Sequence, residues 1–191
     1  MTPKHAMTPL EFALFDTPIG ACAIVWGANG LRGLQLPRES KAETRAHVAK
    51  RWKDARETTP SRPAASAMAA IIALLRGQPS DLMQLPLDMS GVPAFHRRVY
   101  EAARAIPPGS TQSYGELAAA LGTPGAARAV GQALARNPFA IVVPCHRVLA
   151  ARGKLGGFTA TGGVETKTTL LALEGYQPPA PPLPWARAPR G

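Results

Sequence analysis

Residues 138–149 read Pro-Phe-Ala-Ile-Val-Val-Pro-Cys-His-Arg-Val-Leu, and this run decides how the rest of the chain is interpreted. Its four consecutive apolar residues, 140–143, predict a short buried strand that ends at the following proline. Cys145 is therefore expected where the strand gives way to a turn. His146 and Arg147 follow at once, and cations beside a thiol lower its pKa and enlarge the reactive thiolate fraction. The run predicts that Cys145 is a nucleophile.

Two other roles for Cys145 compete with this one. A cysteine in an apolar run is often a small core residue, but a core strand has little use for two basic residues at its edge. A metal site needs about four ligands, whereas the chain offers Cys22, Cys145 and four scattered histidines, without CxxC or HExxH spacing. We therefore expect no metal site. Cys22 stands in an apolar run without polar neighbours and is interpreted as structural.

Length and composition set the class of protein. The chain has 191 residues, which is long enough for one large or two small cores. It carries no apolar leader and no apolar run that approaches the ~20 residues needed to span a bilayer. Two distant cysteines give no disulfide framework, and a nucleophilic thiol needs a reducing compartment. We expect a monomeric cytoplasmic protein without a membrane partner.

The distribution of charge points to a polyanionic partner. The formal net charge is +10, and residues 117–164 contain no Asp or Glu. A solvated protein face usually mixes charges of both signs, whereas a surface that binds a phosphate backbone needs cations. The acid-free span predicts nucleic-acid contact, and its basic residues are Arg128, Arg136, Arg147, Arg152 and Lys154.

The first half alternates apolar runs with turn signals. Residues 9–36 predict three hairpin-linked strands, and two helices are predicted over 42–52 and 64–75. A further helix is predicted over 93–105, where apolar residues recur at helical spacing up to a Pro-Pro-Gly stop.

The next elements have the layout of a helix-turn-helix. A short helix over 114–121, a tight turn over 122–125 and a second helix over 126–136 are predicted, with Ser113 as the cap of the first. The second helix carries little side-chain bulk, which suits either a close approach to a DNA groove or close helix packing. Its small residues include Ala126, Ala127, Ala129 and Gly131.

The boundaries that follow define an α+β chain in two parts. Residues 1–8 are expected to be a flexible N-terminus, 9–88 a supporting domain of sheet and helices, and 89–175 a mainly helical domain. Six prolines predict a disordered tail over 176–191.

Several motifs occur in one order along residues 92–175. They are Ser113–Ala118 (SYGELA), Ala126–Gly131 (AARAVG), Asn137–Pro138, Pro144–Val148 (PCHRV), Lys167, Leu170–Leu171 and Glu174–Gly175. Together they resemble the O6-alkylguanine-DNA alkyltransferases. The resemblance implies a ribonuclease H-like N-terminal domain and a winged helix-turn-helix-like C-terminal domain.

The implied activity is that of a methylated-DNA–protein-cysteine S-methyltransferase. Such a protein repairs DNA on the nucleoid: it flips O6-alkylguanine, chiefly O6-methylguanine, out of the duplex through the minor groove. It then transfers the alkyl group irreversibly to its own cysteine, here Cys145, in a single turnover and without a cofactor.

The resemblance also implies roles for individual residues. Glu174 orients His146, and His146 takes the thiol proton through a water molecule, because adjacent Cys and His side chains cannot easily face each other. Tyr114 donates a hydrogen bond to the flipped base, and Asn137 braces the hinge beside the cysteine. Simple packing of Tyr114 and helix capping by Asn137 are the alternatives.

Residues for DNA and base contact follow in the same way. Arg128 is implied to fill the gap left by the extruded guanine, with a phosphate contact as the alternative. Phe158 replaces a tyrosine usual in the family. The other residues implied in contact with DNA or base are Ser113, Tyr114, Ala126, Ala127, Ala129, Gly131, Arg147, Val148 and Thr159.

The rival function is a regulatory or sensing module that flips an alkylated base without chemistry. Alkyltransferase-like proteins of that kind carry another residue at the cysteine position, so Cys145 tells against it. A fused transcriptional activator is disfavoured because the chain has no cysteine cluster for a second, methyl-accepting zinc site.

Overall fold

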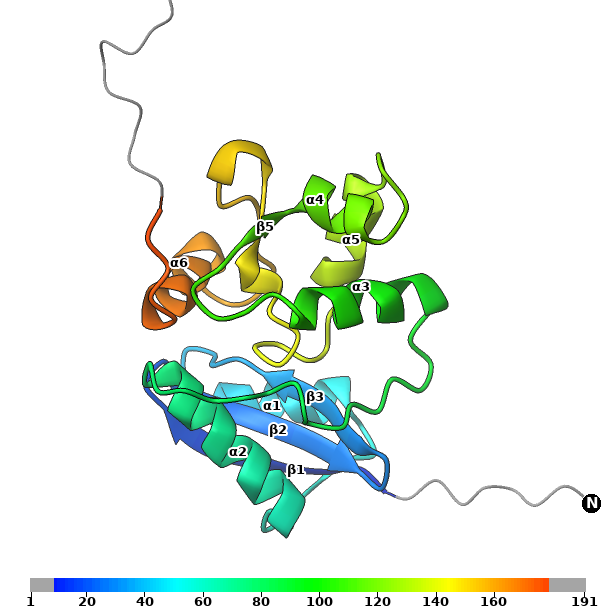
Figure 1. Cartoon of the computed structure of the whole chain (residues 1–191). Coiled ribbons are helices and arrows are strands. Elements are labelled where there is room, and N and C mark those ends of the chain that lie inside the picture. Colours follow the sequence, from blue (N-terminus) through cyan, green and yellow to red (C-terminus); the bar gives the residue numbers. More distant parts are fainter. Residues whose placement is uncertain (1–8, 179–191) are drawn as a thin grey trace, which may run out of the picture.

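The computed structural model describes residues 9–178, and the expectations for 1–8 and 179–191 lie outside them (Figure 1). A four-stranded sheet has the order β3-β2-β1-β4. β1 and β2 pair antiparallel, as do β2 and β3, while β4 runs parallel to β1. The three predicted hairpin-linked strands are thus confirmed. The strands are β1 (Glu11–Thr17), β2 (Gly20–Gly27), β3 (Gly30–Gln35) and β4 (Arg56–Glu57).

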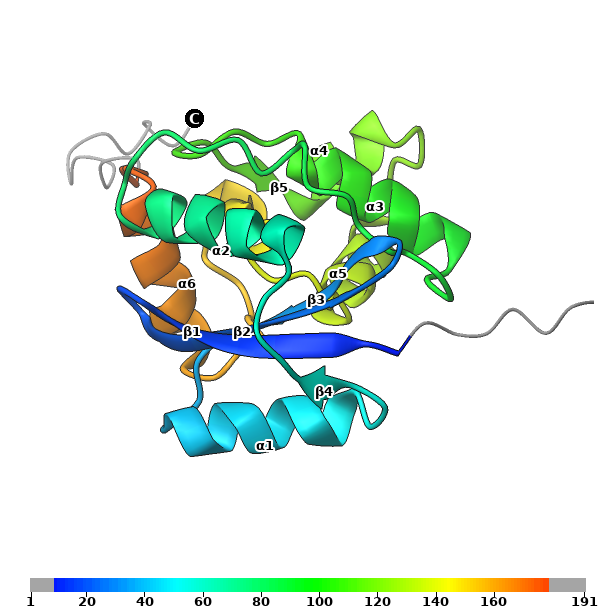
Figure 2. The same cartoon turned by 90° about the horizontal axis from the view of Figure 1, so that it is seen from below.

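Two helices cover opposite faces of this sheet. α1 (Lys41–Arg51) lies on one face, and α2 (Arg62–Leu75) lies on the other together with the second half of the chain (Figure 2). Because side chains alternate along a strand, Val25 packs with Val48 of α1, whereas Ile24 joins the core on the α2 face. Both helices were predicted from the sequence. The predicted start lies one residue after the observed start for α1 and two residues after it for α2.

The second half is mainly helical, as predicted. The helix-turn-helix consists of α4 and α5, and Gly122 and Gly125 adopt positive φ angles of 71° and 89° in its turn. β5 pairs in parallel with β6 at the edge of this half. The elements are α3 (Ala94–Arg104), β5 (Gln112–Ser113), α4 (Tyr114–Ala120), α5 (Ala127–Ala135), η1 (Cys145–Arg147), β6 (Val148–Leu149), η2 (Ala151–Gly153) and α6 (Gly163–Leu173).

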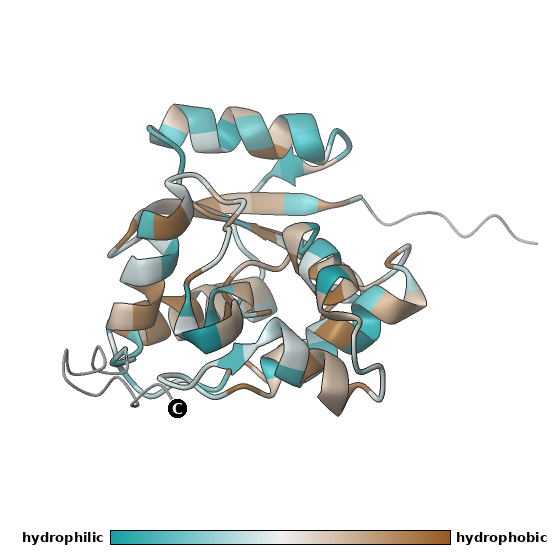
Figure 3. Cartoon of the chain, turned by 90° about the horizontal axis from the view of Figure 1, so that it is seen from above, coloured by the Kyte–Doolittle hydropathy of each residue, from teal (hydrophilic) through white to brown (hydrophobic). Residues whose placement is uncertain are grey.

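The two halves share one continuous core, and the α+β class is confirmed. Buried residues of β2, α2, α3, α5 and α6 belong to the same apolar cluster. In Figure 3, hydrophobic segments, coloured brown, occur in both halves. The backbone N–H of Leu34 in β3 donates to the carbonyl of Pro138 at 2.8 Å. This bond ties the sheet directly to the segment that precedes Cys145. No helix in residues 9–178 has the length and apolarity to cross a membrane.

The strand predicted over residues 140–143 is wrong. The segment is buried, but it forms successive turns in which the N–H of Val143 donates to the carbonyl of Phe139 at 2.7 Å. Ile141 has a φ of 68°, which is rare for a β-branched residue and costs about 1–3 kcal/mol. The apolar run therefore indicated burial, while the backbone satisfies its own hydrogen bonds within the turn.

Candidate active site

Cys145 lies where this buried turn passes into η1 and is half-buried. Its side chain lines a cavity of about 40 Å³ together with Tyr114 and Phe158. It also lines a second cavity of about 230 Å³ that reaches the N-terminal half. One thiol is thus accessible from two adjoining spaces.

The surroundings of Cys145 do not favour a resting thiolate. Burial raises the pKa of the thiol, while a hydrogen bond from Asn137 and the positive charge of Lys167 oppose that rise. The prediction that His146 and Arg147 lower this pKa is wrong, because both side chains are engaged elsewhere. Nucleophilic attack therefore requires a base that removes the proton during the reaction.

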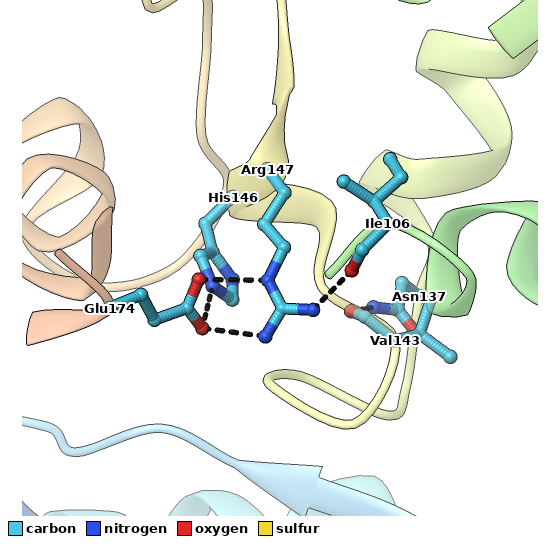
Figure 4. Close-up of polar contacts among 6 residues, drawn as sticks. All are labelled: Ile106, Asn137, Val143, His146, Arg147 and Glu174. Carbon is cyan, nitrogen blue, oxygen red and sulfur yellow. Dashed lines mark hydrogen bonds and ion pairs between the residues drawn. The ribbon is translucent and has the colours of Figure 1, made fainter. Parts of the chain in front are cut away.

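A buried network engages those two side chains. Figure 4 shows the Glu174 carboxylate facing both the imidazole of His146 and the guanidinium of Arg147. His146 Nε2 lies 2.8 Å from Glu174 Oε1, and Arg147 Nε and Nη2 donate to the two carboxylate oxygens at 2.8 Å each. Burial alone would raise the pKa of Glu174, but the hydrogen bonds from His146 and Arg147 lower it to about 2. Glu174 is therefore ionised.

The carboxylate fixes the tautomer of His146. Burial lowers the pKa of this fully buried imidazole, although Glu174 opposes the change, so the ring is neutral near pH 7. Nε2 then carries the hydrogen that is donated to Glu174, which leaves Nδ1 as a proton acceptor. Within residues 9–178, Nδ1 is buried and has no hydrogen-bond partner. The ring is arranged as a general base.

Asn137 braces the turn from both sides. Its Nδ2 donates to the carbonyl of Val143 at 2.8 Å, and its Oδ1 accepts from the N–H of Phe139 at 2.9 Å. The amide thus spans the turn that holds the unfavourable backbone of Ile141.

Replacing Asn137 by Ala leaves these two backbone groups without their partner, so we expect the free energy of unfolding to fall by about 2 kcal/mol. Urea denaturation measures this loss. The matched control is Gln132→Ala, an exposed amide on the neighbouring α5. Equal stabilities of the two variants would show that the brace contributes nothing.

Sequence reasoning gave no role to Lys167, which the structure places at the centre of the site. The side chain is fully buried, and its Nζ donates to the carbonyl of Val148 at 2.7 Å. Burial lowers the pKa of Lys167 to about 8, while the Cys145 charge opposes that change. Its position three and four residues before Leu170 and Leu171 could have revealed that it faces inward. Lys167 supplies positive potential beside the sulfur.

Tyr114 lines the smaller cavity together with Cys145. Burial and the nearby Cys145 raise the pKa of its phenol, so the hydroxyl keeps its proton. A Cβ at Gly131 or at Gly156 would come within 3.7–3.8 Å of the ring, which shows how closely α5 and the following loop approach it. The space contains a proton donor and the thiol.

Comparisons with known proteins identify the family of the chain. Residues 94–176 match the family described as 6-O-methylguanine DNA methyltransferase, DNA binding domain. The chain is 40% identical over 171 residues to a methylated-DNA–protein-cysteine methyltransferase of Mycolicibacterium paratuberculosis, and the match covers 90% of this chain and 96% of the relative. The chain belongs to the methylated-DNA–protein-cysteine methyltransferase family.

Solved structures of similar proteins extend the match to the fold. The Mycobacterium tuberculosis OGT in complex with DNA has a TM-score of 0.69 and 36% identity, over 86% of this chain and 92% of that one. The O6-methylguanine-DNA methyltransferase of Pyrococcus kodakaraensis has a TM-score of 0.63 and 30% identity, over 87% and 99%.

Some of the residues expected to contact DNA are exposed to solvent, and others are buried. Arg128 is exposed on α5, and Ala126, Ala127, Ala129 and Gly131 are partly exposed on the same element. Arg136, Arg152 and Lys154 are also exposed.

Arg147 and Val148 do not fit that expectation. Arg147 is 5% exposed and paired with Glu174, so it does not lie on a surface that DNA can reach. The Val148 side chain is buried, and its carbonyl accepts from Lys167. Ser113 is occupied as a helix cap: its Oγ accepts from the N–H of Glu116, whose carboxylate accepts from the N–H of Ser113.

Phe158 and Thr159 line both cavities beside Cys145. The Thr159 hydroxyl lies 3.4 Å from the carbonyl of Ala135. Within the described residues, no three His, Cys, Asp or Glu side chains come together as metal ligands.

Proposed function

We propose that this chain repairs O6-alkylguanine in duplex DNA, chiefly O6-methylguanine, by transferring the alkyl group to Cys145. The observation that carries the proposal is the Cys145 thiol, which shares a cavity with the Tyr114 phenol and is followed directly in the chain by His146 of the buried His146–Glu174 pair. The sulfur attacks the alkyl carbon, a sulfur–carbon bond forms, and the bond from that carbon to guanine O6 breaks. The thioether product does not hydrolyse, so each molecule reacts once and needs no cofactor.

The thiol must lose a proton, and the departing guanine carries negative charge that must be offset. Glu174 holds the hydrogen on His146 Nε2, so Nδ1 can accept the thiol proton through one water molecule. Tyr114 donates to a ring nitrogen of the departing guanine and offsets its negative charge. Lys167 stabilises the developing thiolate without taking part in proton transfer.

DNA binding is assigned to the face that carries α5. Its partly exposed small residues and the exposed Arg128 suit a helix that approaches the minor-groove floor, while Arg136, Arg152 and Lys154 suit phosphate contact. Ser113 positions Tyr114 through its cap of α4, and Phe158 and Thr159 form a wall of the base pocket.

The two halves are proposed to have different roles. Residues 9–88 support the site, residues 89–175 hold the chemistry and the DNA, and the protein acts as a cytoplasmic monomer on the nucleoid.

Turnover stoichiometry tests this function against a sensing module that only binds the damaged base. With duplex containing O6-methylguanine in excess, we expect restored guanine to level off at one equivalent of protein. Tight binding of this duplex without restored guanine would favour the sensor.

Replacing Arg128 by Ala removes the side chain assigned to the gap left by the flipped base. Unstacking costs a few kcal/mol, so we expect repair in duplex DNA to slow by about 10- to 100-fold. Reaction with the free O6-methylguanine base, which needs no extrusion, serves as the reference and should be unaffected. Single-turnover rates with both substrates measure the difference.

Arg136→Ala is the matched control, since it removes another exposed cation of the same face. If Arg128 instead contacts a phosphate, its replacement by Ala should weaken DNA binding and lower the number of ions released on binding by about one. The Arg128 variant would then behave like the Arg136 variant.

A further inference from the structure

The larger cavity beside Cys145 lies between the two halves of the protein. Its volume is about 230 Å³, and Cys145, Phe158 and Thr159 line it as well as the smaller cavity with Tyr114. The opposite walls come from the end of β3 and the segment after it, and from α1. The thiol therefore stands at the junction of a small cavity and a larger one.

The larger cavity is basic. Arg38, His47 and Arg51 line it, and no lining residue described by the structure is acidic. Arg38 Nη2 lies 2.8 Å from His47 Nδ1, so the arginine is held by a neighbour that does not neutralise its charge. Burial and the charges of Arg38 and Arg51 lower the pKa of His47, which keeps the ring neutral.

Neither arginine has a carboxylate partner in residues 9–178. Arg38 Nε is buried without a hydrogen-bond partner, and the Arg51 guanidinium stacks 4.6 Å from the ring centroid of Trp52. A buried donor such as Arg38 Nε is normally satisfied, so a guanidinium that leaves this nitrogen free in a cavity wall is suited to an anionic ligand.

The geometry of displacement connects this cavity to the reaction. The sulfur, the reacting carbon and guanine O6 must lie nearly in line, so any substituent on that carbon projects to the side. A methyl group needs no such space. A larger alkyl group needs room next to the sulfur, and the basic cavity begins there.

We propose that this cavity receives the side arm of bulkier O6-alkylguanines and that Arg38 and Arg51 favour arms that carry a carboxylate. The inference rests on the proposed function, because the same thiol does the chemistry. Cys145 sulfur bonds to the methylene carbon of the arm, the bond from that carbon to O6 breaks, and the guanine takes up a proton. The product is an S-carboxyalkyl cysteine whose carboxylate stays beside the arginines.

Matched pairs of substrates test the role of charge. Duplexes of one sequence carry O6-carboxymethylguanine or O6-(3-carboxypropyl)guanine, and each acid is paired with its neutral amide of nearly equal shape. The acid-to-amide ratio of single-turnover rates is measured for each pair. Every duplex presents the same phosphates, so phosphate contacts cancel in this ratio.

We expect the ratio for at least one arm length to be about tenfold higher in the wild-type protein than in Arg38→Gln or Arg51→Gln. The acid and the amide differ in intrinsic reactivity, but this difference is the same for every protein. It therefore cancels when the acid-to-amide ratio of a variant is compared with that of the wild type. Lys53→Gln, which removes an exposed cation outside the cavity, should keep the wild-type ratio. Arg51 lies nearer the surface, so its variant decides the outcome if the Arg38 variant does not fold.

Equal ratios in the wild type and both arginine variants would overturn the proposal, as would an equal slowing of acid and amide. Repair of O6-methylguanine distinguishes failure of the carboxylate preference from failure of alkyl transfer to Cys145. If O6-methylguanine is repaired but the ratios do not change, only the carboxylate preference fails. If no adduct reaches Cys145, the proposed function itself fails.

Discussion

Replacing Cys145 by Ser is expected to abolish alkyl transfer while DNA binding persists. A hydroxyl is a far weaker nucleophile than a thiol with the same neighbours, so the single-turnover rate should fall by at least about 10³-fold. Serine is nearly isosteric with cysteine, and the half-buried position tolerates its polarity. The affinity for duplex containing O6-methylguanine, measured by fluorescence anisotropy, should stay within about threefold of the wild-type value.

Cys22→Ala is the matched control for loss of a thiol. Cys22 is fully buried in β2, and burial raises its pKa to about 12, so it has no reactive thiolate. This variant should lose some stability but retain full transfer. Transfer that survives Cys145→Ser, or that disappears with Cys22→Ala, would contradict the assignment of the nucleophile.

Replacing Glu174 by Gln is expected to damage both stability and activity. The substitution leaves the buried Arg147 guanidinium without its anion, and breaking a buried ion pair from one side costs about 3–5 kcal/mol. It also removes the charge that holds the His146 tautomer, so the base loses its orientation. Chemical denaturation measures the first effect, and single-turnover rates measured under folding conditions report the second.

The control for this variant is Glu165→Gln, an exposed acid on the same helix. It should change the free energy of unfolding by less than about 1 kcal/mol, because Glu165 forms no ion pair within residues 9–178 and its charge acts on the helix dipole. Similar losses in the two variants would mean that the buried network does not stabilise the fold.

The stability lost at Glu174 should depend on pH in a defined direction. The folded state holds the pKa near 2, below the ordinary value of 4.5, so the stabilisation is complete above pH 4.5 and is lost as pH falls toward 2. The gap between the wild type and Glu174→Gln should therefore narrow in acid. A gap that stays constant from pH 7 to pH 3 would show that the carboxylate is not the stabilising group.

Local signals in the sequence predicted the helices and hairpins well. Ser113 illustrates why: a cap and its Glu116 partner are three residues apart, so the pattern is complete within one helical turn. The turn over residues 140–143 was mistaken for a strand because burial, which an apolar run does indicate, is compatible with either backbone. The turn is held by side-chain hydrogen bonds of Asn137. A single asparagine produces no periodic pattern in the sequence from which these bonds could be predicted.

Charged residues of the site were harder to predict because their roles depend on distant partners. Arg147 was expected to face DNA, yet it is folded inward by Glu174, 27 residues further along the chain. Arg38 and Arg51 reach the cavity only because β3 is tied to the segment before Cys145. Sequence spacing carries no information about such contacts.

Whether Cys145 accepts the alkyl group is measured by the mass of the protein after reaction with duplex DNA containing O6-methylguanine, followed by peptide mapping. We predict the gain of one methyl group in place of one hydrogen, located on the peptide that contains Cys145 and absent from the Cys145→Ser variant. An unchanged mass despite tight binding to the damaged duplex, or methylation at another residue, would contradict the account.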